Sequence, residues 1–284
     1  MIHNALSVDV EEYYHGMEFE AAVPACKRYR LPSRVERSTE CVLELLSMFN
    51  VCATFFIVGE TAAAHPAIVR RIAAEGHEVA CHSESHELVR RQTPEQFRGD
   101  ILRAKTRLED LSGQAVFGYR APNYSIGGEQ AWAYDILFEA GFLYDSSVYP
   151  IHHDRYGQAQ APRFPYEIRG NGHSKLLEFP IGTIRLLGIN LPIGGGGYFR
   201  LVSTAWIQRS IQHVNSREGQ PIMFYFHPWE LDPNQPRPIM PWHHRFRHYV
   251  GLSRQAAKLS ELFRYTRFDT VREVLTRMSV KGQT

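Results

Sequence analysis

Short apolar, β-branched runs alternate with amphipathic helical patterns along most of the chain. Seven runs have the length and composition of buried strands, and they lie at residues 5–10, 53–58, 77–82, 115–120, 142–145, 175–180 and 222–227. Patterns of helical period are found at residues 33–49, 66–76, 93–111, 129–140, 203–217 and, as two terminal helices, 253–279. This alternation is typical of parallel βα units joined by right-handed crossovers.

The residues between these elements predict where individual helices begin and where loops lie. Ser33 with Glu36 and Thr93 with Gln96 both have the spacing of a capping box, so a helix is expected to begin at each. Residues 194–197 are four consecutive glycines and predict a flexible loop. Residues 147–174 are irregular, and we expect them to form a lobe over one end of the domain.

Composition restricts the class of protein but does not identify it. The 284 residues include 44% hydrophobic and 22% charged residues with a net charge of +2, which is ordinary for a globular protein and gives no reason to expect a nucleic-acid partner. We expect a single domain over residues 1–284. No apolar run reaches the ~20 residues of a membrane span. The N-terminal residues lack the basic start of a signal peptide, and Cys26, Cys41, Cys52 and Cys81 form no CxxC motif, so a cytoplasmic location is expected.

Polar residues able to act in catalysis or metal binding lie at the carboxyl ends of the predicted strands. Their position helps to distinguish two possible architectures, an open sheet and a closed barrel. These residues are Asp9, Glu11, His82, Arg120, Asp145, Glu178 and His227. An open sheet would spread them over several strand spacings of ~4.8 Å, whereas a closed barrel gathers them on one rim. The sequence therefore favours a distorted (β/α)7 barrel resembling a TIM barrel.

A pair of histidines at HxxxH spacing, His82 and His86, suggests a metal site. Two imidazoles with one carboxylate form a common site for divalent metals in hydrolases. The spacing alone is weak evidence, because His244 and His248 share it beside arginines and away from any strand end. We interpret that second pair as surface or substrate-edge histidines.

The first strand can supply the missing carboxylate. Asp9 and Glu11 are two residues apart, so they point to the same side of a strand, where one could bind a metal and the other accept a proton. The simpler alternative is that Glu11 and Glu12 have left the strand and are solvated. Arg120 would orient Asp9 or form a rim salt bridge, and His227 would be a general acid or a core histidine.

Together these segments resemble the polysaccharide deacetylase (NodB-homology) family. Four ordered motifs carry the likeness over residues 5 to about 230: Asp9-Val10-Glu11, His82-Ser83-Glu84-Ser85-His86, Arg120-Ala121-Pro122-Asn123-Tyr124 and Phe226-His227-Pro228. The segments SVDVEEYYH, YDSSVYPIHHDRYG and YFHPWELDPNQPR look closer to the exosortase-associated deacetylases of bacterial exopolysaccharide clusters. That likeness extends to the C-terminal helices.

The resemblance implies the barrel fold and a metal-dependent N-deacetylase of amino sugars in a bacterial polysaccharide or its precursor. Zn²⁺ would be the usual metal, with Co²⁺ and Ni²⁺ also compatible. It assigns Glu11, His82 and His86 as ligands, Asp9 as general base, Arg120 as the residue that holds Asp9, and His227 as general acid. Tyr124, Trp229, Pro122 and the tetraglycine segment would contact the sugar.

The chain departs from the family pattern at several positions. Two adjacent aspartates are usual on the first strand, so Glu12 remains an alternative ligand to Glu11. Asn123 separates the motif's proline from Tyr124. No residue clearly matches the acid that tunes the general acid, for which Asp145 and Glu178 are the candidates.

Two other functions remain open at this stage. An allantoinase-like hydrolase of a small amide would keep the site but enclose it, with an arginine to bind a substrate carboxylate. A carbohydrate-binding relative that has lost catalysis would bind no divalent metal.

Overall fold

Seven parallel strands form the central sheet, in an order that interleaves the two ends of the chain. A computed structural model describes residues 2–28, 30–169 and 175–281. The order is β10 (Met223–Phe226), β1 (Asn4–Val10), β2 (Thr54–Ile57), β3 (Glu78–Cys81), β4 (Gly118–Tyr119), β5 (Tyr144–Asp145) and β7 (Lys175–Glu178). Two short strands extend it: β6 (Tyr166–Arg169) is antiparallel to β7, and β11 (Phe268–Asp269) pairs with the start of β1.

The sheet curls so that β7, at one end of the parallel strand order, approaches β10 at the other end. Ile181, just after β7, forms a parallel bridge with Met223 of β10, and the Gly182 N–H donates to the Met223 carbonyl at 2.9 Å. The result is a distorted seven-stranded barrel, which confirms the predicted fold class. Each of the seven predicted runs contains one of these strands.

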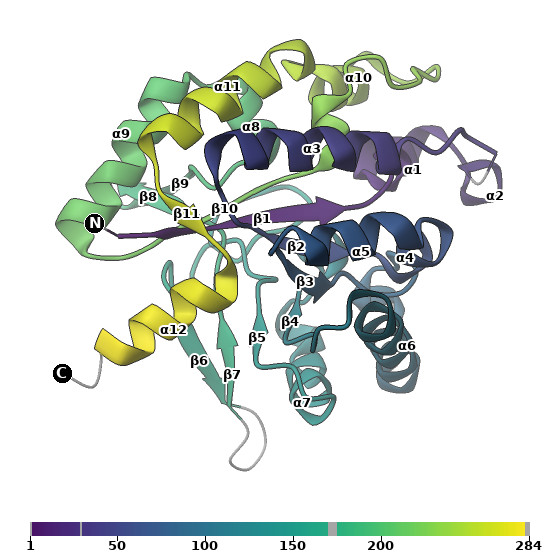
Figure 1. Cartoon of the computed structure of the whole chain (residues 1–284), viewed down its shortest axis with the longest axis horizontal. Helices are drawn as coiled ribbons and strands as arrows, with labels where there is room; N and C mark the ends of the chain where they lie inside the picture. The colour runs from purple at the N-terminus through teal and green to yellow at the C-terminus, as the bar shows by residue number, and fades with distance from the viewer. Residues whose placement is uncertain (1, 29, 170–174, 282–284) are drawn as a thin grey trace.

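Helices cover the outside of the curled sheet, as the helical patterns predict. They include α3 (Val35–Phe49), α5 (Pro66–Ala74), α6 (Pro94–Ser112), α7 (Trp132–Glu139), α9 (Thr204–His213), α11 (Leu252–Tyr265) and α12 (Val271–Lys281). In Figure 1, β1 crosses the middle of the molecule, with α3 and α11 along one side and α6 and α7 toward the other. The apolar faces of all of these helices except α12 meet the sheet residues in one continuous core. The apolar residues of α12 pack in a second cluster, against other sheet residues such as Ala5 and Met223.

Several short elements were not predicted, because each is too short to show a helical or alternating period. They are α1 (Met17–Ala22), α2 (Ala25–Arg28), α4 (Gly59–Ala64), α8 (Gly196–Leu201), α10 (Trp242–Tyr249) and the hairpin of β8 (Thr183–Leu186) with β9 (Ile189–Pro192). The predicted irregular segment 147–174 contains β6, and its residues 170–174 lie outside the described residues.

Of the two predicted capping boxes, only the second exists. Thr93 caps α6 through the Gln96 N–H, and the Gln96 side chain accepts from the Thr93 N–H, so that prediction is confirmed. The box at Ser33 is wrong: its hydroxyl donates to buried Glu12 instead. The other Glu12 oxygen accepts the Arg34 N–H at 3.1 Å, so a distant carboxylate serves the start of α3.

The tetraglycine segment is also not the free loop that its composition predicts. Gly194, Gly195 and Gly196 are buried and Gly197 is half-buried. Gly195 forms a parallel bridge with Tyr225, and α8 begins at Gly196. A Cβ on Gly195 would lie 1.9 Å from the Tyr225 carbonyl oxygen, and its φ is +106°. Glycine is required here because two backbones meet where a side chain would stand.

Two further observations concern the predicted cellular setting. Cys41, Cys52 and Cys81 are free thiols, and the Cys26 side chain lies outside what the structure describes. Among the described residues, none of the helices has the length and hydropathy needed to cross a bilayer.

Candidate functional site

The carboxyl ends of four parallel strands bring the predicted site residues together. Asp9 lies in β1 and Glu11 directly follows it, while His82, Arg120 and His227 directly follow β3, β4 and β10. Parallel strands end on the same rim of a barrel, so residues more than two hundred positions apart in sequence meet there. Both acids and His82 are less than 5% exposed.

Glu11, His82 and His86 form a cluster able to hold a metal ion. One ligand atom from each lies within 4.8 Å of the other two. The Glu11 Oε2 atom is 2.5 Å from His86 Nε2 and 3.8 Å from His82 Nε2. Two imidazoles and a carboxylate on one wall of a pocket fit a catalytic metal that keeps an open position. Glu12, the alternative ligand, is instead committed to Ser33 and Arg34.

Neighbouring groups fix how the ligands of this cluster point. His82 Nδ1 lies 2.8 Å from the Arg120 carbonyl oxygen, which can only accept, so Nδ1 carries the proton and Nε2 faces Glu11 with its lone pair. The Trp229 indole N–H donates to Glu11 Oε1 at 3.3 Å. His86 lies in a tight loop with positive φ, and its N–H donates to the Ser83 hydroxyl.

His15, which was not predicted from the sequence, packs against His86 of this cluster. Its ring stacks on His86 with centroids 4.9 Å apart. Burial, together with the nearby His86, lowers the pKa of His15 to about 3. His15 therefore stays neutral and restrains the His86 ring without adding charge.

Charge favours an ionised carboxylate at Glu11. Burial by itself would raise the pKa of Glu11, but the imidazoles of His86 and His82 outweigh it and hold that pKa well below its ordinary value. An ionised carboxylate is the form that binds a cation.

Arg120 holds Asp9 at the centre of the rim. Its fully buried guanidinium donates from Nη1 to Asp9 Oδ1 at 2.6 Å and to the Ser7 hydroxyl at 2.9 Å. The other two nitrogens donate to the carbonyl and hydroxyl of Ser146, and the group lies 4.2 Å from the Phe56 ring centroid. Asp9 Oδ2 is left to face His227 Nε2 at 4.0 Å. The ion pair between Arg120 and Asp9 is therefore buried and not a solvent-exposed salt bridge of the rim.

The acid that contacts His227 is Glu230, not either of the predicted candidates. Glu230 Oε1 lies 2.8 Å from His227 Nδ1 and accepts the His227 backbone N–H at 3.1 Å. Asp145 and Glu178 instead contact Ser147, Val148 and each other. Glu230 follows His227 by three residues in a short turn after β10, so its offset from the histidine was the missed signal.

This carboxylate determines the protonation of His227. Burial lowers the pKa of His227, but the Glu230 hydrogen bond and the nearby carboxylates of Glu11 and Asp9 raise it above its ordinary value overall. The Nε2 atom, 3.7 Å from Glu11 Oε1, faces the centre of the site. The raised pKa favours the protonated form of His227 at this position.

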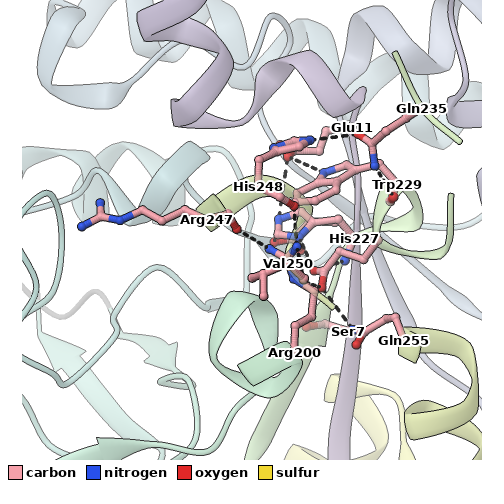
Figure 2. Close-up of polar contacts among 12 residues, drawn as sticks. Ser7, Glu11, Arg200, His227, Trp229, Gln235, Arg247, His248, Val250 and Gln255 are labelled. Atoms are coloured by element: carbon pink, nitrogen blue, oxygen red, sulfur yellow. Dashed lines mark hydrogen bonds and ion pairs between the residues drawn. The ribbon is translucent and has the colours of Figure 1, made fainter. Parts of the chain in front are cut away.

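Glu230 is in turn fixed by buried partners from α8 and α11. Arg200 Nε lies 3.2 Å from Glu230 Oε2, and the Gln255 amide donates to the same oxygen at 3.1 Å. Figure 2 shows this chain of contacts from Gln255 and Arg200 toward His227, with Trp229 and His248 beside it. Arg200 also donates to carbonyl oxygens of Arg247, His248 and Val250 at the end of α10.

A pocket of about 500 Å³ opens over these residues. Aromatic rings form much of its wall: Tyr124, Tyr156, Tyr198, Tyr225, Trp229 and Phe246. Tyr124 and Trp229 therefore lie where substrate contact was predicted. Pro122 does not, because it is buried at the start of a 3-10 turn and is absent from the lining. Of the second histidine pair, His248 is buried and lines the pocket, whereas His244 contacts Glu18.

Comparisons with known proteins divide the chain into two matched regions. Residues 30–135 match the family model described as polysaccharide deacetylase, and residues 146–276 match one described as a domain of unknown function (DUF3473). A chitooligosaccharide deacetylase of Bradyrhizobium sp. (strain ANU 289) is 34% identical over 99 residues, which are 35% of this chain and 43% of the relative. A peptidoglycan-N-acetylglucosamine deacetylase of Bacillus cereus is 38% identical over 84 residues, 30% of each chain. The matches span less than half the length of these curated relatives.

Solved structures share the fold over nearly the whole chain. A Mycobacterium smegmatis protein assigned as a polysaccharide deacetylase superposes with a TM-score of 0.63 at 20% identity, covering 98% of this chain and 90% of the other. A PuuE allantoinase superposes with a TM-score of 0.61 at 16% identity, covering 96% and 88%. At such identities the likeness shows the fold alone. Residues 30–135 are thus similar in sequence to polysaccharide deacetylases.

Proposed function

We propose that this protein is a metal-dependent N-deacetylase of amino sugars in a bacterial polysaccharide or its precursor, with Zn²⁺ as the preferred metal. The observation that carries the proposal is the adjacency of the Glu11, His82 and His86 cluster to the Asp9–Arg120 pair and to His227. The relatives' names, a chitooligosaccharide deacetylase and a peptidoglycan-N-acetylglucosamine deacetylase, point to an N-acetylated glycan. The sequence likeness to exosortase-associated proteins favours an exopolysaccharide among such glycans. The expected cytoplasmic location stays a prediction.

The residues divide the work of amide hydrolysis between them. A divalent cation held by Glu11, His82 and His86 would supply Lewis acidity toward the acetamide carbonyl and the attacking water. Asp9, with one oxygen held by Arg120, accepts the water proton on Oδ2. His227, held by Glu230, donates its Nε2 proton to the leaving amine. The aromatic walls contact the sugar faces and orient the acetamide.

The alternatives fit the described pocket less well. A small-amide hydrolase of the allantoinase kind needs an arginine free for a substrate carboxylate, but Arg120 and Arg200 are both occupied by buried protein partners. The other two arginines that line the pocket, Arg155 and Arg247, are paired with Glu18 and Asp154. A non-catalytic relative would have no need for a buried set of acid, base and ligand groups, because burying them costs free energy.

Acetate release from N-acetylated oligosaccharides tests the proposal. The purified full chain is assayed as isolated, after treatment with a chelator, and after addition of Zn²⁺, Co²⁺ or Ni²⁺. We expect His82→Ala to lose at least about a hundredfold in rate and to lose bound metal, since it removes one ligand. Metal-free wild-type protein with full activity would overturn the metal dependence.

Glu11 and Glu12 provide a matched pair of variants. Glu11→Ala is expected to lose both bound metal and activity. Glu12→Ala removes only the contacts at the start of α3, so it should keep its metal while losing about 1–2 kcal/mol of stability. If Glu11→Ala kept its metal and Glu12→Ala lost it, Glu12 would be the carboxylate ligand.

A further inference from the structure

The outer face of α10 and the segment just before it leave large apolar side chains in solvent beside the pocket. Ile239 is 100% exposed, Trp242 80% and Phe246 53%. Trp242, Phe246 and Val250 are four residues apart, so they follow one side of the helix and form a stripe. Phe246 and Val250 also line the pocket, together with Leu201 of α8, which is itself exposed. The apolar stripe therefore runs from solvent to the pocket mouth.

The charged side chains of the segment that carries this stripe are all basic. Residues 233–260 contain no Asp or Glu, and they include five basic side chains: Arg237, Arg245, Arg247, Arg254 and Lys258. Acids of other elements neutralise part of the helix, because Asp154 contacts Arg247 and Glu18 contacts His244. Arg237, Arg245 and Arg254 stay exposed and form no ion pair within the described part of the chain. In Figure 2 the Arg247 side chain points away from His227 and Trp229.

We propose that Ile239, Trp242, Phe246, Arg237 and Arg245, here called the α10 patch, dock the pocket mouth on an anionic lipid bilayer. Exposed aromatic and aliphatic side chains flanked by arginines match the interface of such a bilayer, where apolar groups enter the acyl boundary and cations meet lipid phosphates. A second copy of the chain fits less well, since two such patches face to face would repel. A soluble polyanion would use the arginines but leave the apolar stripe exposed. This inference concerns a surface and does not depend on the proposed reaction.

The orientation has a consequence for the substrate. Because Phe246 belongs to both the patch and the pocket lining, a docked molecule would present its pocket to the bilayer surface. A glycan carried on a lipid anchor would reach the site there without leaving the membrane.

Vesicle sedimentation of the full-length protein tests the patch. We expect binding to vesicles of phosphatidylcholine with about one third phosphatidylglycerol, little binding to phosphatidylcholine alone, and loss of binding near 1 M salt, where the screening length is about 3 Å. Ile239→Ala with Trp242→Ala should lower the partition coefficient by roughly tenfold, and Arg237→Gln with Arg245→Gln by a similar factor. Because these side chains are exposed, the melting temperature of both double variants should match that of the parent.

A matched control lies on the hairpin turn between β8 and β9. Leu187 and Ile189 are as exposed as the patch residues, so Leu187→Ala with Ile189→Ala removes similar apolar area elsewhere. We expect that variant to bind vesicles like the parent. Tryptophan emission gives a second readout: Trp242 is the exposed one of the four tryptophans, so binding should shift emission to the blue, and Trp242→Phe should abolish the shift.

Three results would overturn the proposal. The first is no binding to anionic vesicles. The second is a loss of binding in the hairpin variant but not in the α10 variants. The third is binding that depends on the arginines but is unchanged in Ile239→Ala with Trp242→Ala, which would indicate a site for a soluble polyanion.

Discussion

At the scale of single residues, Glu230 performs two tasks for His227. It orients the ring by accepting at Nδ1, and its negative charge favours the protonated imidazole. Its own second oxygen is held by Arg200 and Gln255, so little movement is available to it. A carboxylate placed in this way acts on the reaction only through His227, and its removal should change the pH profile as well as the rate.

Glu230→Gln is the substitution that tests this role. A general acid must be protonated, so activity falls as pH rises through the pKa of His227, which Glu230 helps to raise. The glutamine is expected to lower that pKa, moving the alkaline limb of the kcat/KM profile to lower pH, and to reduce kcat by roughly 10- to 100-fold. The check is a pH–rate profile of acetate release.

Glu178→Gln serves as the control for that profile, because Glu178 was a sequence candidate for the same task. Its carboxylate contacts the Val148 N–H and Asp145 rather than His227, so the alkaline limb should stay in place. If the alkaline limb moved in the Glu178 variant and not in the Glu230 variant, Glu178 would be the acid that tunes His227.

At the scale of elements, a strand or helix could be predicted where its sequence pattern continues over several consecutive residues. The strands were found because runs such as Thr54–Ile57 and Met223–Phe226 are continuously apolar and buried. The capping of α3 was missed because Glu12 lies more than twenty residues before the helix it serves. The tetraglycine segment was misread because composition does not distinguish glycines needed for close packing from glycines needed for flexibility.

Gly195→Ala should therefore be far more damaging than an ordinary glycine substitution. Its new Cβ would collide with the Tyr225 carbonyl oxygen of β10, and the backbone at Gly195 has a φ of +106°. We expect a loss of about 3 kcal/mol or more in the free energy of unfolding, measured by urea denaturation. Gly113→Ala is the matched control: its φ is also positive, but the space is open, so about 1 kcal/mol is expected. Equal losses would show that backbone strain alone, not the close approach, requires glycine at Gly195.

At the scale of the whole molecule, the site exists only because the barrel brings together both matched regions of the chain. His82, His86 and Arg120 come from the region matched to polysaccharide deacetylases, whereas Arg200, His227 and Glu230 come from the second region. The order of motifs made it predictable that Asp9, Glu11 and His82 would lie close together, since strand ends of a barrel share one rim. The supporting contacts of His15, Arg200 and Gln255 were not predictable, because they depend on how loops and outer helices pack.

A buried acid pair on the β5 and β7 strands should make the stability of this barrel depend on pH. Burial raises the pKa of both Asp145 and Glu178, and the Asp145 charge raises that of Glu178 well above its ordinary value. The folded chain thus keeps a proton that the unfolded chain releases above about pH 4.5. Its contribution to stability is complete below that pH and is lost as pH rises through the folded pKa of Glu178.

Glu178→Gln keeps the shape of the protonated acid and removes its titration. As pH rises above about 4.5, the parent's free energy of unfolding should therefore fall relative to that of the variant, by up to about 1.4 kcal/mol per pH unit. The difference should stop growing once the pH passes the pKa of Glu178 in the folded protein. Urea denaturation of both proteins at a series of pH values measures this difference. Glu167→Gln on β6 makes the same chemical change at an exposed side chain beside Lys175, and its difference from the parent should stay flat with pH. Parallel curves for the Glu178 variant and the parent would mean that Glu178 is ionised in the folded protein, and that the buried pair is stabilised without a shared proton.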